Sequence, residues 1–390
     1  MQSSTMSKYF SLFLLCASQT VFAQKEQLPI IRSTTSELSI IENKEIITKW
    51  YLNPNVEWDV YQTGKNPTSK NIKIVTDIDS LAIDLKAGQT FDFLVVQNDK
   101  DTFKTRFTSP KLINYATTKP KQKSIIPFQL TDDNNIQTQA TLNHKDSVKL
   151  LFDSGATGFY LKKTVIKSIF NPEGKPLTMK DISDNHFQIA DLKWDHEQIY
   201  PLETTGDCCV GMYGWDAFDG KVMEINYDKN EITVYTKKPK ISADYAVFDM
   251  EIMKEHFCIY LEIEIDNKRY KVRFLFDTGF QKGLMLDKTM MTELGVAVND
   301  LPVLKKSVMY NSQNQEIPVT IFTANKLIVG KYVLENIPAQ LNESNRPAGY
   351  ATNFLGNEVL KRFNAILVFQ NNKVYLKPNH LLNVAYLDKK

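Results

Sequence analysis

Two short stretches of the chain place an aspartate at the end of an apolar run and follow it with a hydroxyl residue and a glycine. They are LLFDSG at 150–155 and FLFDTG at 274–279. A single Asp-Ser/Thr-Gly triplet is most often an ordinary turn in which local N–H groups satisfy the carboxylate. Two triplets after similar apolar runs need a common explanation, because chance rarely repeats both the triplet and its setting.

The chemistry that such a pair can perform is general acid–base hydrolysis. One carboxylate takes a proton from water, while a second carboxyl group, still protonated, donates to the scissile group. Two carboxyl groups about 3 Å apart cannot both ionise easily, so they share one proton and provide both functions. The sequence therefore predicts Asp153 and Asp277 as a catalytic pair. The glycines allow close approach of backbone N–H groups, and the hydroxyl residues brace the turns; these supports are Ser154, Gly155, Thr278 and Gly279.

The segments around the two triplets repeat, which predicts one small β-domain written twice. A hairpin pattern leads into each triplet, in IQTQATLNHKDSVKLLFD and in CIYLEIEIDNKRYKVRFLFD. The copies also end alike, because YGWDAFDGKVMEINYDKNEITVY aligns without a gap on LGNEVLKRFNAILVFQNNKVYLK, with Gly214 on Gly356. The predicted halves are residues 125–240 and 241–390.

The repeated triplets and hairpins resemble those of aspartic peptidases, and this resemblance implies a mobile hairpin that covers the bound substrate and excludes water. In the second half, SVMYNSQNQEIPVTIF alternates like two strands around a polar tip, which makes Tyr310, Asn311, Ser312 and Gln313 candidate flap residues. The corresponding stretch of the first half, IFNPEGKPLTMKDISDNHF, is longer and less regular. The alternative for either stretch is a plain surface hairpin.

With these features, the chain from Ile125 onward resembles the retropepsin and pepsin families of aspartic peptidases. The resemblance implies an all-β fold, in which two tandem retropepsin-like acid-protease β-barrel halves form a bilobed unit behind a small N-terminal β-domain. It also implies that MYG and FLG, which end in Gly214 and Gly356, pack behind the catalytic turns. The implied activity is hydrolysis of an extended peptide or protein substrate between the halves, without a metal or an organic cofactor.

The position after each glycine departs from the family pattern. It is Ala156 in the first copy and Phe280 in the second, and neither carries the hydroxyl that pepsin-like enzymes place there. Without that hydrogen bond to the ionised form, and with a bulky ring that limits water, we expect a raised upper pKa and activity at weakly acidic pH. Phe280 also favours an alternative, a non-catalytic protein that binds peptides on the same scaffold.

Residues 24–124 lie outside the resemblance. Between Trp50 and Phe107, five β-favouring segments separated by turn signals predict an all-β unit. The polar stretch SPKLINYATTKPKQKS then predicts a linker that ends near Ser124. A further alternative is that this N-terminal domain is the working part, as an adhesion or carbohydrate-binding module, and that the repeated domain is its scaffold.

The first 23 residues have the pattern of a secretory signal, since Lys8 precedes an apolar run that ends in the small residue Ala23. A membrane anchor is less favoured, because the run is shorter than the about 20 apolar residues that span a bilayer. A lipid anchor at Cys16 is also less favoured, because Leu15 is bulky for that context. We therefore expect an exported protein, periplasmic or extracellular, with no membrane span after signal removal. The balance of 47 basic and 45 acidic side chains favours no nucleic-acid partner, and the oligomeric state is left open.

Three cysteines remain beyond the signal: the adjacent pair Cys208 and Cys209, and Cys258. In an oxidising compartment one of the pair could bridge to Cys258, but connectivity does not follow from sequence. No CxxC or closely spaced histidine pattern accompanies them, so no metal site is predicted. We expect the cysteines to be structural.

Overall fold

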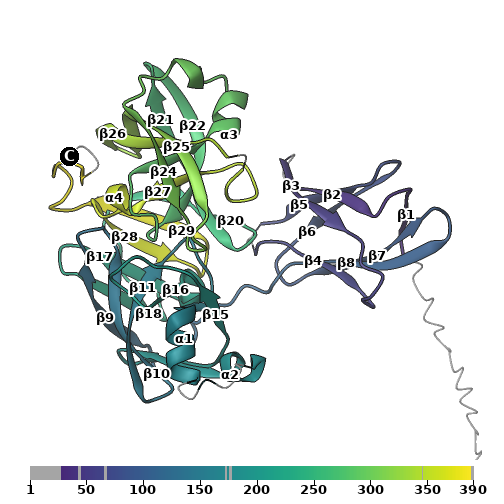
Figure 1. Cartoon of the computed structure of the whole chain (residues 1–390), viewed down its shortest axis with the longest axis horizontal. Coiled ribbons are helices and arrows are strands. Elements are labelled where there is room, and N and C mark those ends of the chain that lie inside the picture. The colour runs from purple at the N-terminus through teal and green to yellow at the C-terminus, as the bar shows by residue number, and fades with distance from the viewer. Residues whose placement is uncertain are drawn as a thin grey trace, which may run out of the picture.

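The computed structural model describes residues 28–42, 45–65, 68–171, 174, 178–344 and 346–387. The predicted signal, residues 1–23, lies outside these ranges. The chain is mostly β-structure, as the sequence predicts, and it forms an N-terminal domain beside a larger body of two lobes (Figure 1). Among the helices in the described ranges, none is long and apolar enough to cross a lipid bilayer.

The N-terminal domain consists of two four-stranded sheets, with the orders β1-β7-β8-β4 and β3-β2-β5-β6. Buried and exposed residues alternate along most of these strands, so each sheet buries one face. The two buried faces meet in one core that contains Ile40, Ile72, Phe93 and Phe107. The strands are β1 (Ile30–Ser33), β2 (Glu37–Glu42), β3 (Glu45–Tyr51), β4 (Asp59–Gln62), β5 (Lys70–Val75), β6 (Ser80–Leu85), β7 (Thr90–Gln97) and β8 (Asp101–Thr108).

Three of these strands precede Trp50 or contain it, whereas the sequence predicts a β-unit that starts there. β2 alternates regularly, but its third inward position is Glu42, a charged residue that breaks the apolar pattern. Glu42 is buried because its carboxylate pairs with the buried ammonium of Lys70 at 2.6 Å. The apolar alternation that would predict β2 is therefore incomplete in the sequence, because its last inward residue is a glutamate that pairs with a lysine from a distant segment. Residues 109–122, where a linker is predicted, contain neither helix nor strand.

The first half of the body carries its acidic triplet at the end of a long hairpin. β10 pairs antiparallel with β11, and β11 ends at Asp153. The elements are β9 (Lys123–Leu130), β10 (Ile136–Leu142), β11 (Asp146–Asp153), β12 (Phe159–Lys162), α1 (Lys163–Phe170), α2 (Met179–Ser183), β13 (Asn185–Ile189), β14 (Leu192–Glu197), β15 (Ile199–Leu202), β16 (Gly211–Gly214), the 3₁₀ helix η1 (Trp215–Phe218), β17 (Val222–Asn226) and β18 (Glu231–Tyr235).

The second half repeats this order around β21 and β22, which ends at Asp277. In both halves the triplet strand runs parallel to the closing strand, with Asp153 opposite Gly214 and Asp277 opposite Gly356. The elements are β19 (Ala246–Asp249), β20 (Glu251–Met253), β21 (His256–Ile265), β22 (Lys268–Asp277), β23 (Leu284–Asp287), α3 (Lys288–Glu293), η2 (Val298–Asp300), β24 (Lys305–Tyr310), β25 (Glu316–Val329), β26 (Tyr332–Asn342), β27 (Asn353–Gly356), α4 (Asn357–Leu360), β28 (Phe363–Val368) and β29 (Lys373–Pro378).

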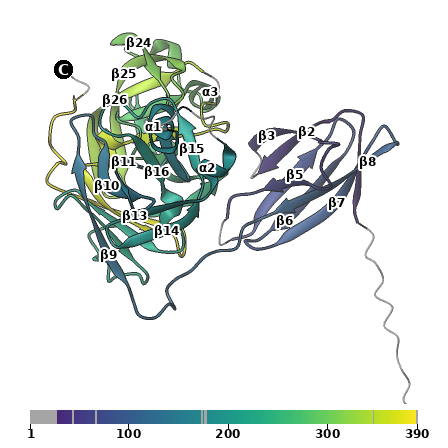
Figure 2. The same ribbon diagram turned by 60° about the horizontal axis from the view of Figure 1, so that its bottom comes forward.

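The two halves share one antiparallel run of strands, in the order β9-β18-β17-β28-β29-β19. The junction is the pairing of β17 with β28, from Val222 opposite Val368 to Ile225 opposite Ala365. Figure 1 shows β28 and β29, in yellow, between the lobes, and Figure 2 shows the same body from another side with the N-terminal domain beside it. Every residue of β28 is buried, and one continuous core extends through both halves. The halves are therefore joined by a sheet rather than by a flexible link.

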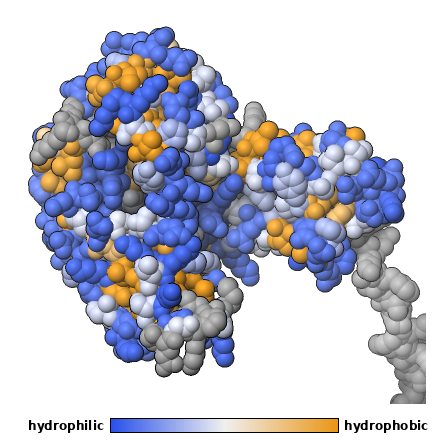
Figure 3. All heavy atoms as spheres, viewed as in Figure 1, coloured by the Kyte–Doolittle hydropathy of each residue, from blue (hydrophilic) through white to orange (hydrophobic). Residues whose placement is uncertain are grey.

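The N-terminal domain docks on the body through β20 and its surroundings. The Lys70 ammonium donates to the carbonyl of Ile252 at 3.2 Å, and Ile47 packs in a small core with Met253. A Cβ at Gly64 would lie 2.5 Å from the Ile252 oxygen, so the contact needs a glycine there. Figure 3 shows that hydrophilic residues cover most of the visible face of the molecule.

Candidate active site

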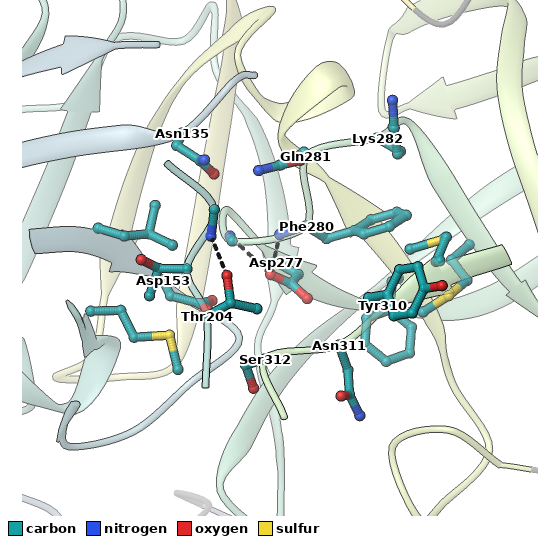
Figure 4. Close-up of a pocket in the computed structure, with 18 of the residues that line it drawn as sticks. Asn135, Asp153, Thr204, Asp277, Phe280, Gln281, Lys282, Tyr310, Asn311 and Ser312 are labelled. Carbon is teal, nitrogen blue, oxygen red and sulfur yellow. Dashed lines mark hydrogen bonds between the residues drawn. The ribbon is translucent and has the colours of Figure 1, made fainter. Parts of the chain in front are cut away.

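Asp153 and Asp277 meet at the interface of the two halves (Figure 4), where both line one cavity. Each carboxyl group also lies against the glycine of the opposite turn. A Cβ at Gly155 would be 2.7 Å from the Cγ of Asp277, and a Cβ at Gly279 would be 2.3 Å from the Cγ of Asp153. Any side chain at either glycine would therefore collide with the carboxyl group of the other half.

The two turns are fastened by crossed hydrogen bonds. The Ser154 hydroxyl donates to the carbonyl of Phe276 at 2.8 Å, and the Thr278 hydroxyl donates to the carbonyl of Phe152 at 3.1 Å. In addition, the N–H of Ser154 donates to the Thr278 hydroxyl, and the N–H of Thr278 to the Ser154 hydroxyl, both at 2.9 Å. Both side chains are fully buried, so these four bonds fix the spacing of the carboxyl groups without competition from water.

Burial and mutual repulsion set the ionisation of the pair. Burial raises the pKa of Asp153, while the N–H of Gly155, 2.8 Å from its Oδ1, acts in the opposite direction. Burial and then the negative charge of Asp153 raise the pKa of Asp277 well above its usual value. The N–H groups of Phe280 and Gly279, at 2.8 and 3.0 Å from Oδ1 of Asp277, oppose that rise only in part. The pair therefore holds one shared proton over a wide pH range.

The closing glycines lie directly behind the turns. A Cβ at Gly214 would be 2.3 Å from the carbonyl oxygen of Ala156, and one at Gly356 would be 2.1 Å from that of Lys282. The residue after each glycine then reaches across to the other half. The Trp215 indole donates to the carbonyl of Glu255 at 2.9 Å, and the equivalent amide of Asn357 donates to the carbonyl of Asn134.

The candidate flap is a hairpin of β24 and β25, and its tip crosses the cleft. The Ser312 carbonyl accepts hydrogen bonds from the N–H groups of Glu203 and Thr204 in the first half, at 3.1 and 3.2 Å. Tyr310, Asn311 and Ser312 line the cavity that contains the two aspartates. The fourth predicted residue, Gln313, lies in the tip turn, where its N–H donates to the Asn311 side chain at 3.0 Å.

The matching stretch of the first half does not mirror this hairpin. Its described part comprises the end of α1 and the short helix α2, and residues 172, 173 and 175–177 lie outside the described ranges. The site therefore has its hairpin cover on the second half, where the sequence alternates around a polar tip.

A cavity of about 590 Å³ surrounds the aspartates, and one of its walls is apolar. Phe280 belongs to this wall. Its ring packs edge-on against Phe354, with centroids 6.3 Å apart, and Figure 4 shows it directed away from the Asp153 carboxyl group. The large residue after the second triplet thus forms part of a side-chain pocket and leaves the carboxyl pair open. The apolar wall consists of Phe280, Met285, Met309, Ile317 and Phe354.

Sequence reasoning missed several polar residues that line the same cavity, among them Asn135, Thr204 and Gln281. Asn135 is almost fully buried and its Oδ1 has no hydrogen-bond partner, so it can accept one from a bound molecule. Gln281 comes two residues after Gly279, so its nearness to the second triplet could have predicted that it lines the cavity. Asn135 and Thr204 are brought in by pairing between distant segments and have no comparable signal.

The three cysteines beyond the predicted signal are free thiols, so no bridge joins the pair to Cys258. Cys258 is fully buried between the hydroxyls of Tyr350 and Thr352, in a different part of the body from Cys208 and Cys209. Within the described ranges, no group of three or more His, Cys, Asp or Glu side chains is placed to hold a metal ion.

Comparison with known proteins addresses the second half. No curated protein matches the chain significantly. One family model does match, and its span includes the triplet at Asp277 and the closing glycine Gly356. Residues 261–359 match the family described as Aspartyl protease, and over this span the chain is similar to the aspartyl proteases.

Proposed function

We propose that the protein is an exported aspartic endopeptidase, in which two tandem retropepsin-like halves each supply one aspartate to a central cleft. One observation carries this proposal: two carboxyl groups from repeated turns lie together inside a frame of four crossed hydrogen bonds. The match of residues 261–359 to the aspartyl protease family supports it at the level of peptide hydrolysis.

The arrangement supports a direct attack of water on the peptide bond. With one proton on the pair, the ionised carboxylate removes a proton from a water held between the two groups, and the protonated carboxyl group donates to the peptide oxygen. The hydroxide equivalent adds to the carbonyl carbon. The tetrahedral adduct then collapses as the nitrogen receives a proton and leaves as an amine. The raised pKa of Asp277 favours that residue as the proton donor and Asp153 as the base in the first step.

The alternative is a protein that binds peptides without cutting them. Phe280 favours it, because a bulky residue after the second triplet departs from the pattern of the aspartic peptidases. Incubation of the protein with a mixed peptide library over a pH series separates the two. New amino termini, formed by the unaltered protein and absent with Asp153→Asn, are expected for a peptidase. Capture of peptides without new termini at any pH would favour the binding protein.

The pH dependence of cleavage follows from the pKa shifts. Activity needs one proton on the pair, so it falls as the pH rises through the upper pKa and also as the pH drops through the lower one. Both aspartates have raised pKa values, so we expect the active window to extend into weakly acidic solution. A pH profile of kcat/KM checks this, with Ala156→Thr, which restores a hydroxyl, expected to lower the optimum. Activity confined to strongly acidic solution would contradict the expectation.

The apolar wall predicts a preference for a bulky apolar side chain beside the scissile bond. Met309 lines the cavity, whereas its neighbour Val308 on the same strand is 48% exposed and points the other way. Met309→Lys should therefore reduce kcat/KM for peptides with Leu, Met or Phe at this position by roughly 10- to 100-fold, the equivalent of losing one buried apolar contact.

Val308→Lys, which adds the same charge on the outer face of β24, serves as the matched control and should leave cleavage unchanged. Peptides with a small polar residue at the same position should respond weakly to both variants. Equal losses for all peptides with Met309→Lys would mean that the wall does not select the side chain.

A further inference from the structure

Cys208 and Cys209 form a vicinal dithiol beside the cleft. Their sulfur atoms lie 2.9 Å apart, and both thiols are free. Cys209 is buried, whereas Cys208 is only partly covered and remains accessible from outside. The pair lies in the loop between β15 and β16, outside the catalytic machinery described above.

Two buried amide side chains are directed at this pair. The Asn135 amide nitrogen is 3.5 Å from the sulfur of Cys208, and the Gln137 amide nitrogen is 3.8 Å from the sulfur of Cys209. Gln137 also donates to the carbonyl of Cys208 at 2.6 Å. Asn135 and Gln137 are each more than nine-tenths buried, so these donors are fixed in place. N–H donors directed at sulfur stabilise a thiolate.

The two thiols differ in acidity in a way that assigns them different roles. The hydrogen bond with Cys209 lowers the pKa of Cys208 to about 7, against the effect of burial. The same hydrogen bond and then burial raise the pKa of Cys209. The partly exposed thiol of Cys208 is therefore the one that forms a thiolate near neutral pH, and once it has ionised the buried Cys209 can donate its S–H to it.

We propose that Cys208 and Cys209 are a redox modification site at which a disulfide co-reactant converts the dithiol to a vicinal disulfide. The Cys208 thiolate attacks one sulfur of the co-reactant, R–S–S–R, forming a mixed disulfide and releasing one thiolate. Cys209 then gives up its proton and attacks the Cys208 sulfur, which releases the second thiolate. In total, two cysteine thiols are oxidised to one disulfide, and one R–S–S–R is reduced to two R–SH. The inference is independent of the proposed peptidase activity.

Such a bond would be reversible. Adjacent Cα atoms are about 3.8 Å apart, which is shorter than the about 4.4–6.8 Å of ordinary disulfides. The resulting strain makes a vicinal disulfide easier to reduce than a structural one, as is typical of regulatory disulfides.

The location connects the dithiol with both walls of the cleft. Cys209 packs against Leu151 and Met212, which line the cavity. A few residues upstream, Glu203 and Thr204 hold the flap tip, and the chain enters β16 just downstream of the pair. Ring closure at 208–209 would therefore alter a segment that carries part of the substrate-binding wall.

The test is a thiol analysis of the full-length protein. The reduced protein is exposed to oxidised glutathione, free thiols are blocked with iodoacetamide, and the peptide containing residues 208 and 209 is weighed by mass spectrometry. We expect this peptide to escape blocking, to be lighter by two hydrogen atoms and to regain both thiols with dithiothreitol. Without oxidant, alkylation of Cys208 should become half-maximal near neutral pH, while Cys258 stays unreactive in the folded protein.

Cys209→Ser should retain a glutathione adduct on Cys208, because the resolving thiol is gone, and Cys258→Ser should behave like the unaltered protein. Two outcomes would overturn the proposal: both thiols of the unaltered protein remaining free at the oxidant concentrations that modify exposed cysteines, or a stable glutathione adduct persisting on Cys208. Because the readout is the mass of one peptide, either result stands whether or not the protein cleaves peptides.

Discussion

Replacement of Asp153 or Asp277 by asparagine is expected to lower kcat/KM for peptide cleavage by on the order of 10⁴-fold or more, and the double variant should be no worse than either single one. The reason is that the two carboxyl groups act as one acid–base unit, whose members are strongly non-additive. Among the described residues that line the cavity, Asp153 and Asp277 carry the only carboxyl groups, so no other acid is placed to take over. Initial rates on a cleaved library peptide provide the measurement.

Loss of activity through unfolding can be distinguished from loss of chemistry by the sign of the stability change. A buried carboxyl group with a raised pKa favours the folded state when protonated, and that contribution is lost as the pH rises through its folded-state pKa. Asp277→Asn removes the buried charge, so at pH 8 this variant should resist urea at least as well as the unaltered protein. Asp249→Asn, at a highly exposed aspartate of the shared sheet, should change neither cleavage nor stability. Mild and additive losses on replacing Asp153 and Asp277 would support the peptide-binding alternative.

Glu358→Ala is expected to destabilise the protein by about 3–5 kcal/mol, the usual result of removing one partner from a buried ion pair. Glu358 is fully buried, and its carboxylate pairs with Lys361 at 2.8 Å and with Arg362 at 2.7 Å. Glu358 also accepts a hydrogen bond from the Asn134 amide, which donates in addition to the carbonyl of Gln281 beside the second Asp-Thr-Gly turn. The variant would leave two buried cations without their carboxylate.

Equilibrium unfolding in urea checks this prediction, with Glu57→Ala as the matched control. Glu57 also pairs with a lysine, Lys104, but both side chains are largely exposed, so its loss should change stability by no more than about 1 kcal/mol. A similar small effect for Glu358→Ala would show that Lys361 and Arg362 find other partners. A Glu358→Gln variant, which keeps the shape and part of the hydrogen bonding, should lie between the two.

Much of the site was predictable because its signals are local. The two triplets, the hairpins that lead into them and the closing glycines lie on short segments whose residue types are imposed by contacts within a few ångströms. Gly155 and Gly279 are the clearest examples, since any Cβ there would strike the opposite carboxyl group. The hairpin of the candidate flap was predictable for the same reason, because its two strands, β24 and β25, lie on either side of a polar tip.

The remaining features depend on pairing between distant segments. The junction pairs β17 with β28, two strands at equivalent positions of the repeat. The alignment of the two copies does not indicate that these strands pair with each other, and no local pattern indicates their register. Asn135 reaches the cavity only because the turn before β10 lies against the second half. A glutamate such as Glu42 in β2 is predicted to lie on the surface, and only its ion pair with the distant Lys70 explains why it is buried. In each case the residue type is explained by a partner that sequence spacing alone does not identify.

The bridge between the flap tip and the first half has an energetic consequence for what can enter the cleft. Two backbone hydrogen bonds to the Ser312 carbonyl, each contributing about 0.5–1.5 kcal/mol net, hold the cover closed. On that basis the open form amounts to roughly 1–15% of molecules, and a peptide that needs it binds more weakly in proportion. An extended peptide strand can replace the two lost hydrogen bonds, because its own carbonyls can accept from the N–H groups of Glu203 and Thr204. A folded surface cannot offer its carbonyls in this way, so in the proposed peptidase the hairpin would favour unfolded chain segments as substrates, whatever their side chains.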